Sequence, residues 1–473
     1  MKSSHRLLVI SSILFTVGGC VQGPSGSENS NVPTVSTDVS NSTVTASPTP
    51  SASTLPSPSS AAVTNASPVT FPVLDAFFAD EDFARELKDK LALNDDQIDR
   101  LRNAAREKTA KLREDASGRG RGSTAQATKL ADQEVKEVIG EDKAKQLYAL
   151  IQERWGGEPP IIAVARQPNA IPTDTRIVVN IPAYRMDLFQ NGNLVKSYQV
   201  GIGYPEFPLP TGMRKAETVI FNPTWTPPDE PWVESSNKVK PGQKIAAGNK
   251  LNPLGPAKIP IGLPSLIHGG KQPAKIGGFA SHGCIGLTTP QLNEFIPILG
   301  NLSGSQISET DVTEYEKDKT DTKKVKLNQA VPVELRYETI VVQNGALHIF
   351  RDVYDKDTNN EQNLETVLAA YGVTPDQLND KEKTKIAAAL SAMSRDANGK
   401  STEEKADSGK IASKKLAKNK DGSPKITRSV KGKKEVIVEV AALKGKGYPE
   451  PVQLNNGGAP QRTGKASKQA QKK

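Results

Sequence analysis

The sequence predicts a mixed α+β protein in which a mainly β domain follows a small α-helical domain and precedes a helical segment and a basic tail. Three observations support this fold class. Apolar residues recur at helical spacing within residues 71–157, short alternating segments separated by turn residues dominate residues 173–338, and lysines accumulate after residue 396. The chain has 473 residues, enough for two to four domains, and a formal net charge of +9.

Residues 1–19 are typical of a bacterial lipoprotein signal peptide. Lys2 and Arg6 flank the start of an apolar run that ends at Val17 and is too short for the roughly 20 residues that span a bilayer. The run leads into Val17-Gly18-Gly19-Cys20, which resembles a lipobox and implies cleavage before Cys20 and lipidation of its thiol. The alternative is an ordinary signal peptide with a chance cysteine.

This segment predicts an exported protein that a lipid anchors to a membrane of the cell envelope, with its domains in the periplasm. Val21 stands where an Asp commonly signals retention at the inner membrane, which favours the outer membrane in an organism that has one. Residues 20–70 consist largely of Ser, Thr, Pro, Asn and Ala and predict a disordered linker.

Residues 71–157 predict a helical hairpin or bundle with a structural or partner-binding role. Asn94 or Asp95 is a candidate helix cap, and Ser117–Gly122 is a predicted break between helical arms. The periodic apolar residues are Leu87, Leu91, Ile98, Leu101 and Leu112, followed by Leu130, Val135, Val138, Leu147 and Ile151.

Residues 173–338 open with a predicted strand pair. Thr175–Asn180 and Ala183–Phe189 alternate like strands, Asn191-Gly192 predicts a hairpin turn, and Leu194–Ile202 returns. The many prolines and glycines between Pro205 and Pro264 favour loops over a mainly β scaffold.

The rest of this region predicts one short helix and one loop. Pro290–Leu299 is expected to be helical, with Thr289 as its cap. Ser303–Lys326 is polar, charged and without a period, which indicates an inserted loop or lid. Val331–Tyr337 is expected to close the domain.

Residues 339–395 predict a β-hairpin followed by helices. The hairpin is expected over Ile340–Phe350 around Asn344-Gly345, with His348 on a sheet surface, and Leu364–Met393 is expected to be helical. Residues 396–473 predict a Lys-rich, mostly disordered tail in which only Glu435–Leu443 is apolar enough for a strand.

The basic tail bears on partners. In an exported protein it meets anionic wall polymers or lipid head groups, and we expect no nucleic acid as partner. A tail that is merely solvated is the alternative.

Reactive side chains gather in one Gly-rich segment. Of two cysteines and four histidines in the chain, Cys284, His268 and His282 fall within 17 consecutive positions. A free thiol titrates near 8.5, so only about 3% is thiolate at neutral pH, and a neighbouring imidazole can remove the proton. Backbone amides around Gly283 and Cys284 are candidates to stabilise the oxyanion of an acyl-transfer intermediate.

Two structural alternatives compete with this interpretation. A buried cysteine is commonly a small inert hydrophobe, and a lone histidine commonly satisfies a hydrogen bond in the core. A zinc site built from His268, His282 and Cys284 lacks a fourth ligand at suitable spacing. We therefore expect neither a metal nor a cofactor.

The segment resembles the signature of the L,D-transpeptidase catalytic domain (YkuD/ErfK type), in which a histidine is followed after a spacer by Ser281-His282-Gly283-Cys284. The resemblance covers roughly residues 175–336, about a third of the chain, and implies a β-sandwich-like catalytic domain over 173–338. Four further blocks resemble the family in the right order: residues 181–189, 210–212, 222–228 and 252–255.

The resemblance implies a cysteine-dependent transferase of peptidoglycan biosynthesis, a process that serves cell wall organization and cell shape. Cys284 would be the nucleophile that attacks the third residue of a stem peptide, a diamino acid, and releases the terminal D-alanine. His268 would donate and accept the proton, with its ring oriented by the main-chain carbonyl of Gly269. His282 and Gly283 would belong to the oxyanion region. The acyl group would pass to an amine of a second stem peptide or of a lipoprotein.

One position departs from the family, which usually places an arginine two residues after the cysteine. This chain has Gly286 there. Our hypothesis is that Lys271, Lys275 or Arg185 supplies the missing charge. The candidate substrate-contacting residues are Ser281, Trp225, Lys271 and Arg185.

Two other functions remain open. The first is an L,D-carboxypeptidase that uses water as acceptor. The second is a non-catalytic wall-binding lipoprotein that retains the fold, an interpretation made possible by Gly286, although no LysM-like repeat supports it.

Overall fold

The structure is a computed structural model. It describes residues 68–78, 80–114, 123–156, 167–227, 233, 238–262, 265–319, 321–401 and 427–458. The predicted signal peptide with Cys20, and nearly all of the predicted linker over 20–70, lie outside these residues, as do 402–426 and 459–473 of the tail. Within the described ranges, no helix has the length and apolar character needed to cross a membrane.

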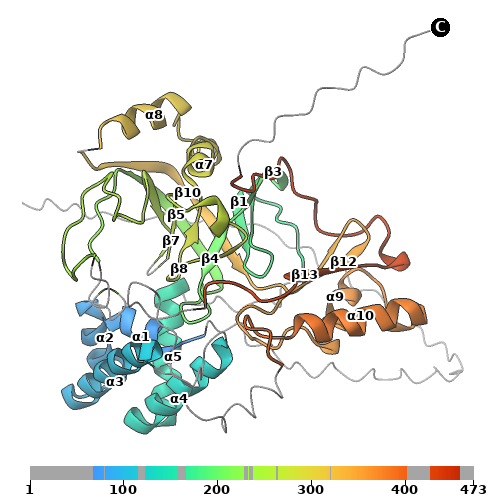
Figure 1. The fold of residues 1–473 in the computed structure, drawn as a ribbon, viewed down its shortest axis with the longest axis horizontal. Coiled ribbons are helices and arrows are strands. Elements are labelled where there is room, and N and C mark those ends of the chain that lie inside the picture. Colours follow the sequence, from blue (N-terminus) through green and yellow to red (C-terminus); the bar gives the residue numbers. More distant parts are fainter. Residues whose placement is uncertain are drawn as a thin grey trace, which may run out of the picture. The chain divides into compact units, whose positions relative to one another are not determined.

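The N-terminal part of the described chain is helical, as predicted (Figure 1). Its apolar faces form one core in which Phe83 and Leu147 are fully buried. Asn94 caps the third helix, because its side chain accepts from the Gln97 amide at 2.9 Å and the Gln97 side chain accepts from the Asn94 amide at 3.2 Å. The predicted break at Ser117–Gly122 lies outside the described residues. The helices are α1 (Phe71–Phe78), α2 (Glu81–Leu91), α3 (Asp95–Glu114), α4 (Thr124–Ile139) and α5 (Glu141–Gly156).

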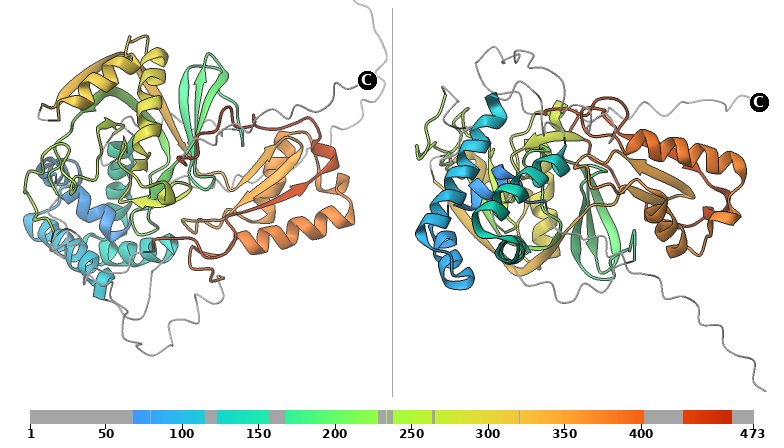
Figure 2. Two further views of the ribbon diagram at one scale, coloured as in Figure 1. Left: turned by 45° about the horizontal axis from the view of Figure 1, so that its top comes forward. Right: turned by 90° about the horizontal axis from the view of Figure 1, so that it is seen from below.

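A large curled ten-stranded sheet builds the central domain, in the order β3-β2-β1-β10-β5-β6-β7-β9-β4-β8 (Figures 1 and 2). The hairpin between β2 and β3 turns at Asn191 and Gly192, whose φ angles of 49° and 80° match the predicted turn. The strands are β1 (Arg176–Asn180), β2 (Arg185–Gln190), β3 (Asn193–Gln199), β4 (Gly201–Gly203), β5 (Gly212–Phe221), β6 (Ala257–Pro260), β7 (Leu266–His268), β8 (Gly278–Ser281), β9 (Ile285–Gly286) and β10 (Lys323–Arg336).

Helix α7 (Thr289–Leu302) packs on this sheet and supports the segment that carries the cysteine. It begins with a capping box between Thr288 and Gln291, one residue before the predicted cap. Phe295 is fully buried and meets Tyr198 of β3 edge-on at 6.0 Å. The helix therefore extends the core of the domain directly behind the end of β9.

The prediction of an inserted loop or lid over Ser303–Lys326 is wrong. This segment contains α8 (Glu309–Lys317), opened by a capping box between Ser308 and Asp311, and the first residues of β10. Val312 is the only helix residue that is buried, so the sequence of α8 carries almost no apolar period. The capping residues Ser308 and Asp311, rather than a pattern of apolar residues, are the sequence signal for this helix.

A second sheet of three strands, in the order β11-β12-β13, follows the central domain together with two helices (Figure 2). The predicted hairpin is present, and Asn344 and Gly345 take φ angles of 48° and 78° at its turn. His348 is half-buried, with Nδ1 2.5 Å from a carboxylate oxygen of Glu435. These elements are β11 (Ile340–Gln343), β12 (Ala346–Phe350), α9 (Glu361–Ala370), α10 (Asp380–Met393) and β13 (Glu435–Glu439), with short 3₁₀ helices η1 (Pro273–Lys275), η2 (Pro375–Gln377) and η4 (Ala441–Leu443).

The prediction of a mostly disordered tail fails for residues 427–458. Strand β13 lies within the predicted Glu435–Leu443 and adds to the edge of β12. Beyond it, the Tyr448 hydroxyl donates to the buried Asp187 carboxylate at 3.2 Å, and the Asn455 amide donates to the Ser197 carbonyl at 3.0 Å. A few apolar and aromatic side chains anchor this segment, and the Lys434 ammonium group donates to the Gly277 carbonyl, so the lysine-rich composition alone does not reveal that it folds.

A substitution in β13 tests this correction. Val438 is 3% exposed and packs in the core of the second sheet, whereas Ile437 on the opposite face is 53% exposed. Val438→Ala is expected to lower the free energy of unfolding by about 2 kcal/mol through lost burial. Ile437→Ala, the matched control, is expected to change it by less than about 0.5 kcal/mol. Urea denaturation of the full chain measures both, and equal effects would show that β13 does not pack as described.

Candidate active site

Cys284 lies in a tight loop between β8 and β9. The Ser281 hydroxyl accepts from the Cys284 amide at 2.9 Å and donates to the Cys284 carbonyl at 2.5 Å. Gly283 takes a φ of 89°, which strains any residue with a side chain, and its carbonyl accepts from the Ser265 hydroxyl at 2.9 Å. These bonds fix the backbone on both sides of the cysteine. Because the Cys284 amide already donates to the Ser281 hydroxyl, this geometry does not support the prediction that the amide stabilises an oxyanion.

His268 lies at the end of β7, the strand next to β9. The register places Ile267 opposite Ile285 and His268 opposite Gly286. Cys284 directly precedes β9, and a hydrogen bond from the Leu266 backbone acts on its thiol, so the cysteine lies against the start of the strand that ends at His268. The ring is 3% exposed, and its Nδ1 lies 2.9 Å from the Gly269 carbonyl oxygen, as the resemblance implies. When Nδ1 donates to this carbonyl, Nε2 carries no proton. A backbone hydrogen bond with Leu254 also acts on the ring.

Burial sets the protonation of both groups. It lowers the pKa of His268 well below its ordinary value, and the positive charge of Lys271 acts in the same direction. Burial also raises the pKa of the Cys284 thiol, against the opposing effects of a hydrogen bond from the Leu266 backbone and the charges of Lys271 and Lys258. At neutral pH the resting pair is therefore a thiol and a neutral imidazole rather than an ion pair.

Two lysines lie beside this pair. Lys258 on β6 is the cross-strand partner of His268 on β7. Lys271 runs across Gly286, because a β-carbon at Gly286 would lie 2.7 Å from its Cγ and 2.9 Å from its Cε. The missing side chain at Gly286 makes room for Lys271. This arrangement agrees with the hypothesis that Lys271 supplies charge at the position where the family has an arginine.

His282 has a packing role in this structure. Its ring meets the rings of Tyr204 and Phe207 edge-on, at centroid distances of 5.2 Å and 4.5 Å. The Tyr204 amide donates to the Ser281 carbonyl at 2.9 Å, so the same turn holds the start of the loop. The oxyanion role expected of His282 and Gly283 stays a prediction.

Residues 174–313 match the family model of the L,D-transpeptidase catalytic domain. This chain carries a domain of that family. The prediction from the Ser-His-Gly-Cys segment is thereby confirmed at the level of family and fold, over less than a third of the 473 residues. No curated protein matches the chain.

Solved structures similar to the chain carry the same family name. The NMR structure of the catalytic domain from the E. faecium L,D-transpeptidase is 17% identical with a TM-score of 0.23, covering 35% of this chain and 100% of that one. An L,D-transpeptidase from Mycobacterium smegmatis is 14% identical with a TM-score of 0.20, covering 34% and 58%. One from Mycobacterium tuberculosis H37Rv is 15% identical with a TM-score of 0.19, covering 34% and 57%. The match thus spans little more than half of the mycobacterial chains, and the family model, not these superpositions, identifies the domain.

Two of the predicted substrate-contacting residues lie elsewhere in the transpeptidase domain. Trp225 packs in a small cluster with Val233, Val239 and Ile245, and it exchanges main-chain hydrogen bonds with Ile245. The partners of this cluster do not include the Cys284 loop. Its predicted contact with substrate finds no support in this geometry.

Arg185 is committed to structural contacts. Its guanidinium donates to Asp187 at 2.8 Å, to the Gln343 side chain at 2.8 Å and to the Pro449 carbonyl at 2.9 Å. These partners join β2 to β11 and to the C-terminal segment, and none belongs to the Cys284 loop. The proposal that Arg185 replaces the family arginine is therefore not supported.

Sequence reasoning missed Lys258. Strand β6 lies in a Pro- and Gly-rich stretch that was expected to form loops, so nothing placed this lysine beside His268. The register of β6 on β7, which depends on long-range pairing, is the information that was lacking.

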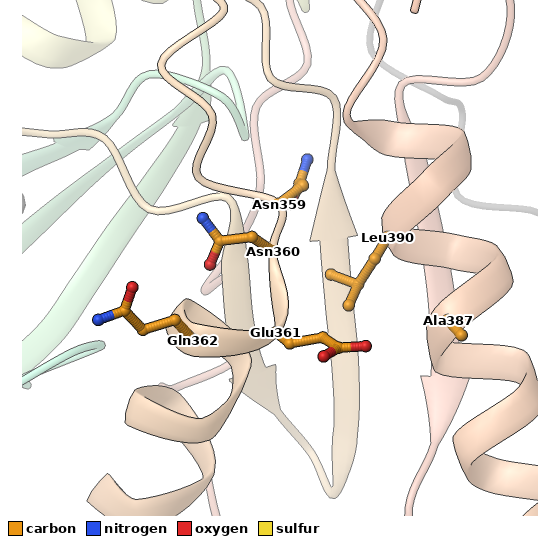
Figure 3. A pocket seen from close by; sticks show the side chains of 6 residues that line it. All are labelled: Asn359, Asn360, Glu361, Gln362, Ala387 and Leu390. Atoms are coloured by element: carbon orange, nitrogen blue, oxygen red, sulfur yellow. The ribbon is translucent and has the colours of Figure 1, made fainter. Parts of the chain in front are cut away.

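The hollows on the described part of the molecule include two of similar size. The one in Figure 3, of about 580 Å³, lies between the start of α9 and α10 and is lined by neither Cys284 nor His268. A second, also of about 580 Å³, is lined in part by Asn222, Asn252 and Gly255. Gly255 abuts the backbone after His268, since a β-carbon there would lie 2.5 Å from the Gly270 nitrogen. The second hollow therefore adjoins the segment that carries the histidine.

Arg185→Met tests the structural role of this residue. The substitution removes the guanidinium that donates to the Asp187 carboxylate, which is 3% exposed, and breaking such a buried pair costs about 3–5 kcal/mol. The rate of Cys284 acylation per folded molecule is expected to stay within about twofold of the unchanged protein. Urea denaturation and a β-lactam acylation assay measure the two effects. Full stability with lost acylation would instead place Arg185 in the substrate site.

The pH dependence of Cys284 alkylation tests the resting protonation state. Because burial raises the thiol pKa, iodoacetamide labelling is expected to increase with pH through an apparent pKa above the ordinary value of about 8.5. In urea the same thiol should titrate at its ordinary value. Peptide mass spectrometry of the labelled Cys284 peptide provides the measurement. An apparent pKa below about 7 in the folded protein would indicate a thiolate–imidazolium pair instead.

Proposed function

We propose that this protein is a peptidoglycan L,D-transpeptidase in which Cys284 is the nucleophile and His268 is the proton carrier. The observation that supports it most directly is the pairing of β7 with β9 inside a transpeptidase domain. This pairing sets the strand that follows the cysteine beside the strand that carries His268. Ser281 and Gly269 hold the two groups through main-chain contacts.

The first half-reaction forms a thioester. His268 Nε2 takes the thiol proton as the Cys284 sulfur attacks the carbonyl carbon of the third stem residue, a diamino acid. The carbon–nitrogen bond then breaks, the imidazolium returns the proton to the leaving nitrogen, and D-alanine departs. The lowered pKa of His268 suits the first step, since a neutral ring is ready to accept a proton.

The second half-reaction transfers the acyl group to an amine. The attacking nitrogen gives its proton to His268, the carbon–sulfur bond breaks, and the thiol is restored. Water in place of the amine gives carboxypeptidase activity, so the acceptor decides between the two enzymatic alternatives. The non-catalytic alternative rested on Gly286, and the position of Lys271 over that glycine weighs against it.

The proposed setting is the cell envelope. We propose export through residues 1–19, lipid anchoring through Cys20, and a periplasmic domain that acts on wall stem peptides. The basic residues near the C-terminus are proposed to contact anionic wall polymers.

Digestion of purified muropeptides by the full chain tests the function. The unchanged protein is expected to release D-alanine from tetrapeptide stems and, with an amine acceptor present, to form a joined product. Cys284→Ala is expected to lower this rate by about 10⁴-fold or more, because the nucleophile is lost. Mass spectrometry reads both products.

The outcomes separate the alternatives. A joined product supports transpeptidation, whereas a tripeptide stem alone, with or without acceptor, supports the carboxypeptidase. No product, together with no carbapenem adduct on Cys284 by intact mass, would contradict both. A folded Cys284→Ala variant, checked by circular dichroism, is the control.

A further inference from the structure

Two cations flank the histidine on one face of the sheet. The cross-strand row runs Ile220, Lys258, His268 and Gly286, and Lys258 and His268 are direct partners, with side chains that start roughly 5 Å apart. Lys271 fills the space above Gly286 on the other side of His268. The order along the row is therefore lysine, histidine, lysine.

Neither lysine is neutralised by the described part of the chain. Other lysines of this protein form salt bridges, such as Lys196 with Glu294, but none is formed by Lys258 or Lys271 among the described residues. The acidic group whose charge acts on both is the Cys284 thiol. Both lysines are partly buried, and a desolvated ammonium group without an anion is costly. The site is thus built with positive charge that a ligand can compensate.

The geometry of the reaction indicates where that ligand charge would lie. A general acid must come within about 2.6–3.2 Å of the leaving nitrogen. When the leaving group is a single amino acid, its carboxyl carbon lies about 2.5 Å from that nitrogen, two bonds away. A leaving nitrogen at His268 therefore places its carboxylate among the side chains that flank His268.

We propose that Lys258 and Lys271 bind the free α-carboxylate of the residue that leaves, so that recognition of this carboxylate depends on these two side chains. This inference rests on the proposed function and names the group of the donor that the site recognises. Gly286 is part of this proposed carboxylate site, because any side chain at residue 286 would displace Lys271. The pair also keeps positive charge beside the Cys284 sulfur as the thiol loses its proton.

The test compares two donors that differ only in this group. One is a tetrapeptide stem with a free C-terminal carboxylate, and the other is its C-terminal amide. The full chain is expected to show a kcat/KM for the acid at least about tenfold above that for the amide. Lys271→Met and Lys258→Met should each bring this ratio close to one through a higher KM for the acid, whereas kcat should fall alike for both donors because each variant also loses positive charge beside the sulfur.

Matched variants distinguish loss of the Lys271 charge from a general loss of activity or stability. Gly286→Ala is expected to reduce the ratio as Lys271→Met does, and the two changes together should have no further effect, because both remove the same ammonium group. Lys271→Arg should retain the preference for the acid. Lys326→Met removes an exposed lysine of β10 that is paired with Thr218, outside this row, and should leave the ratio unchanged.

A binding measurement keeps this test independent of turnover. Calorimetry with Cys284→Ala should show the acid binding at least about tenfold tighter than the amide, and the difference should disappear in Cys284→Ala/Lys271→Met. Turnover without acid preference would overturn the lysine proposal and leave the transpeptidase intact. Acid-selective binding without turnover would support the lysine proposal and contradict the transpeptidase function. A preference that survives both lysine substitutions, or no measurable binding of either peptide, would also overturn the lysine proposal.

Discussion

The register of β7 on β9 is the constraint on which the rest of the site depends. It sets His268 opposite Gly286 and thereby brings the imidazole, the cysteine loop and Lys271 together. A slip of one residue would turn His268 to the opposite face of the sheet. The buried Ile267 and Ile285, which are partners in the same pairing, resist such a slip because the isoleucine of the displaced strand would leave the core. The packing of these apolar side chains in the core therefore fixes the position of His268 relative to the Cys284 loop.

Desolvation gives this site a resting state that differs from a preformed ion pair. Burial favours the uncharged forms of both His268 and Cys284, so it lowers the pKa of the histidine and raises the pKa of the thiol. The positive charges of Lys258 and Lys271 lower both pKa values. The lysines thus favour a thiolate next to a neutral ring. A carboxylate delivered by a donor would reduce that positive field, so binding and activation are coupled through the same charges.

Local signals in the sequence were sufficient for part of this structure. The Asn-Gly turns at residues 191 and 344 and the Cys284 segment were recognised from a few adjacent residues, whose conformations depend mainly on their own chemistry. The position of Arg185 in an inter-strand network, the folding of residues 427–458, and Lys258 beside His268 all depend on contacts between distant segments. Hydrophobic periodicity cannot report such contacts. Helix α8 was missed for a different reason, since it buries a single residue.

Gly286 and Lys271 are best understood as one unit. Considered alone, a glycine at the family's arginine position suggests a weakened enzyme. In the structure the same glycine is the condition for Lys271 to reach across β9, so the site keeps a cation but receives it from a different segment. An arginine restored at 286 would have to displace Lys271, and two cations would then compete for one space beside His268. The position of Lys271 therefore depends on the absence of a side chain at residue 286.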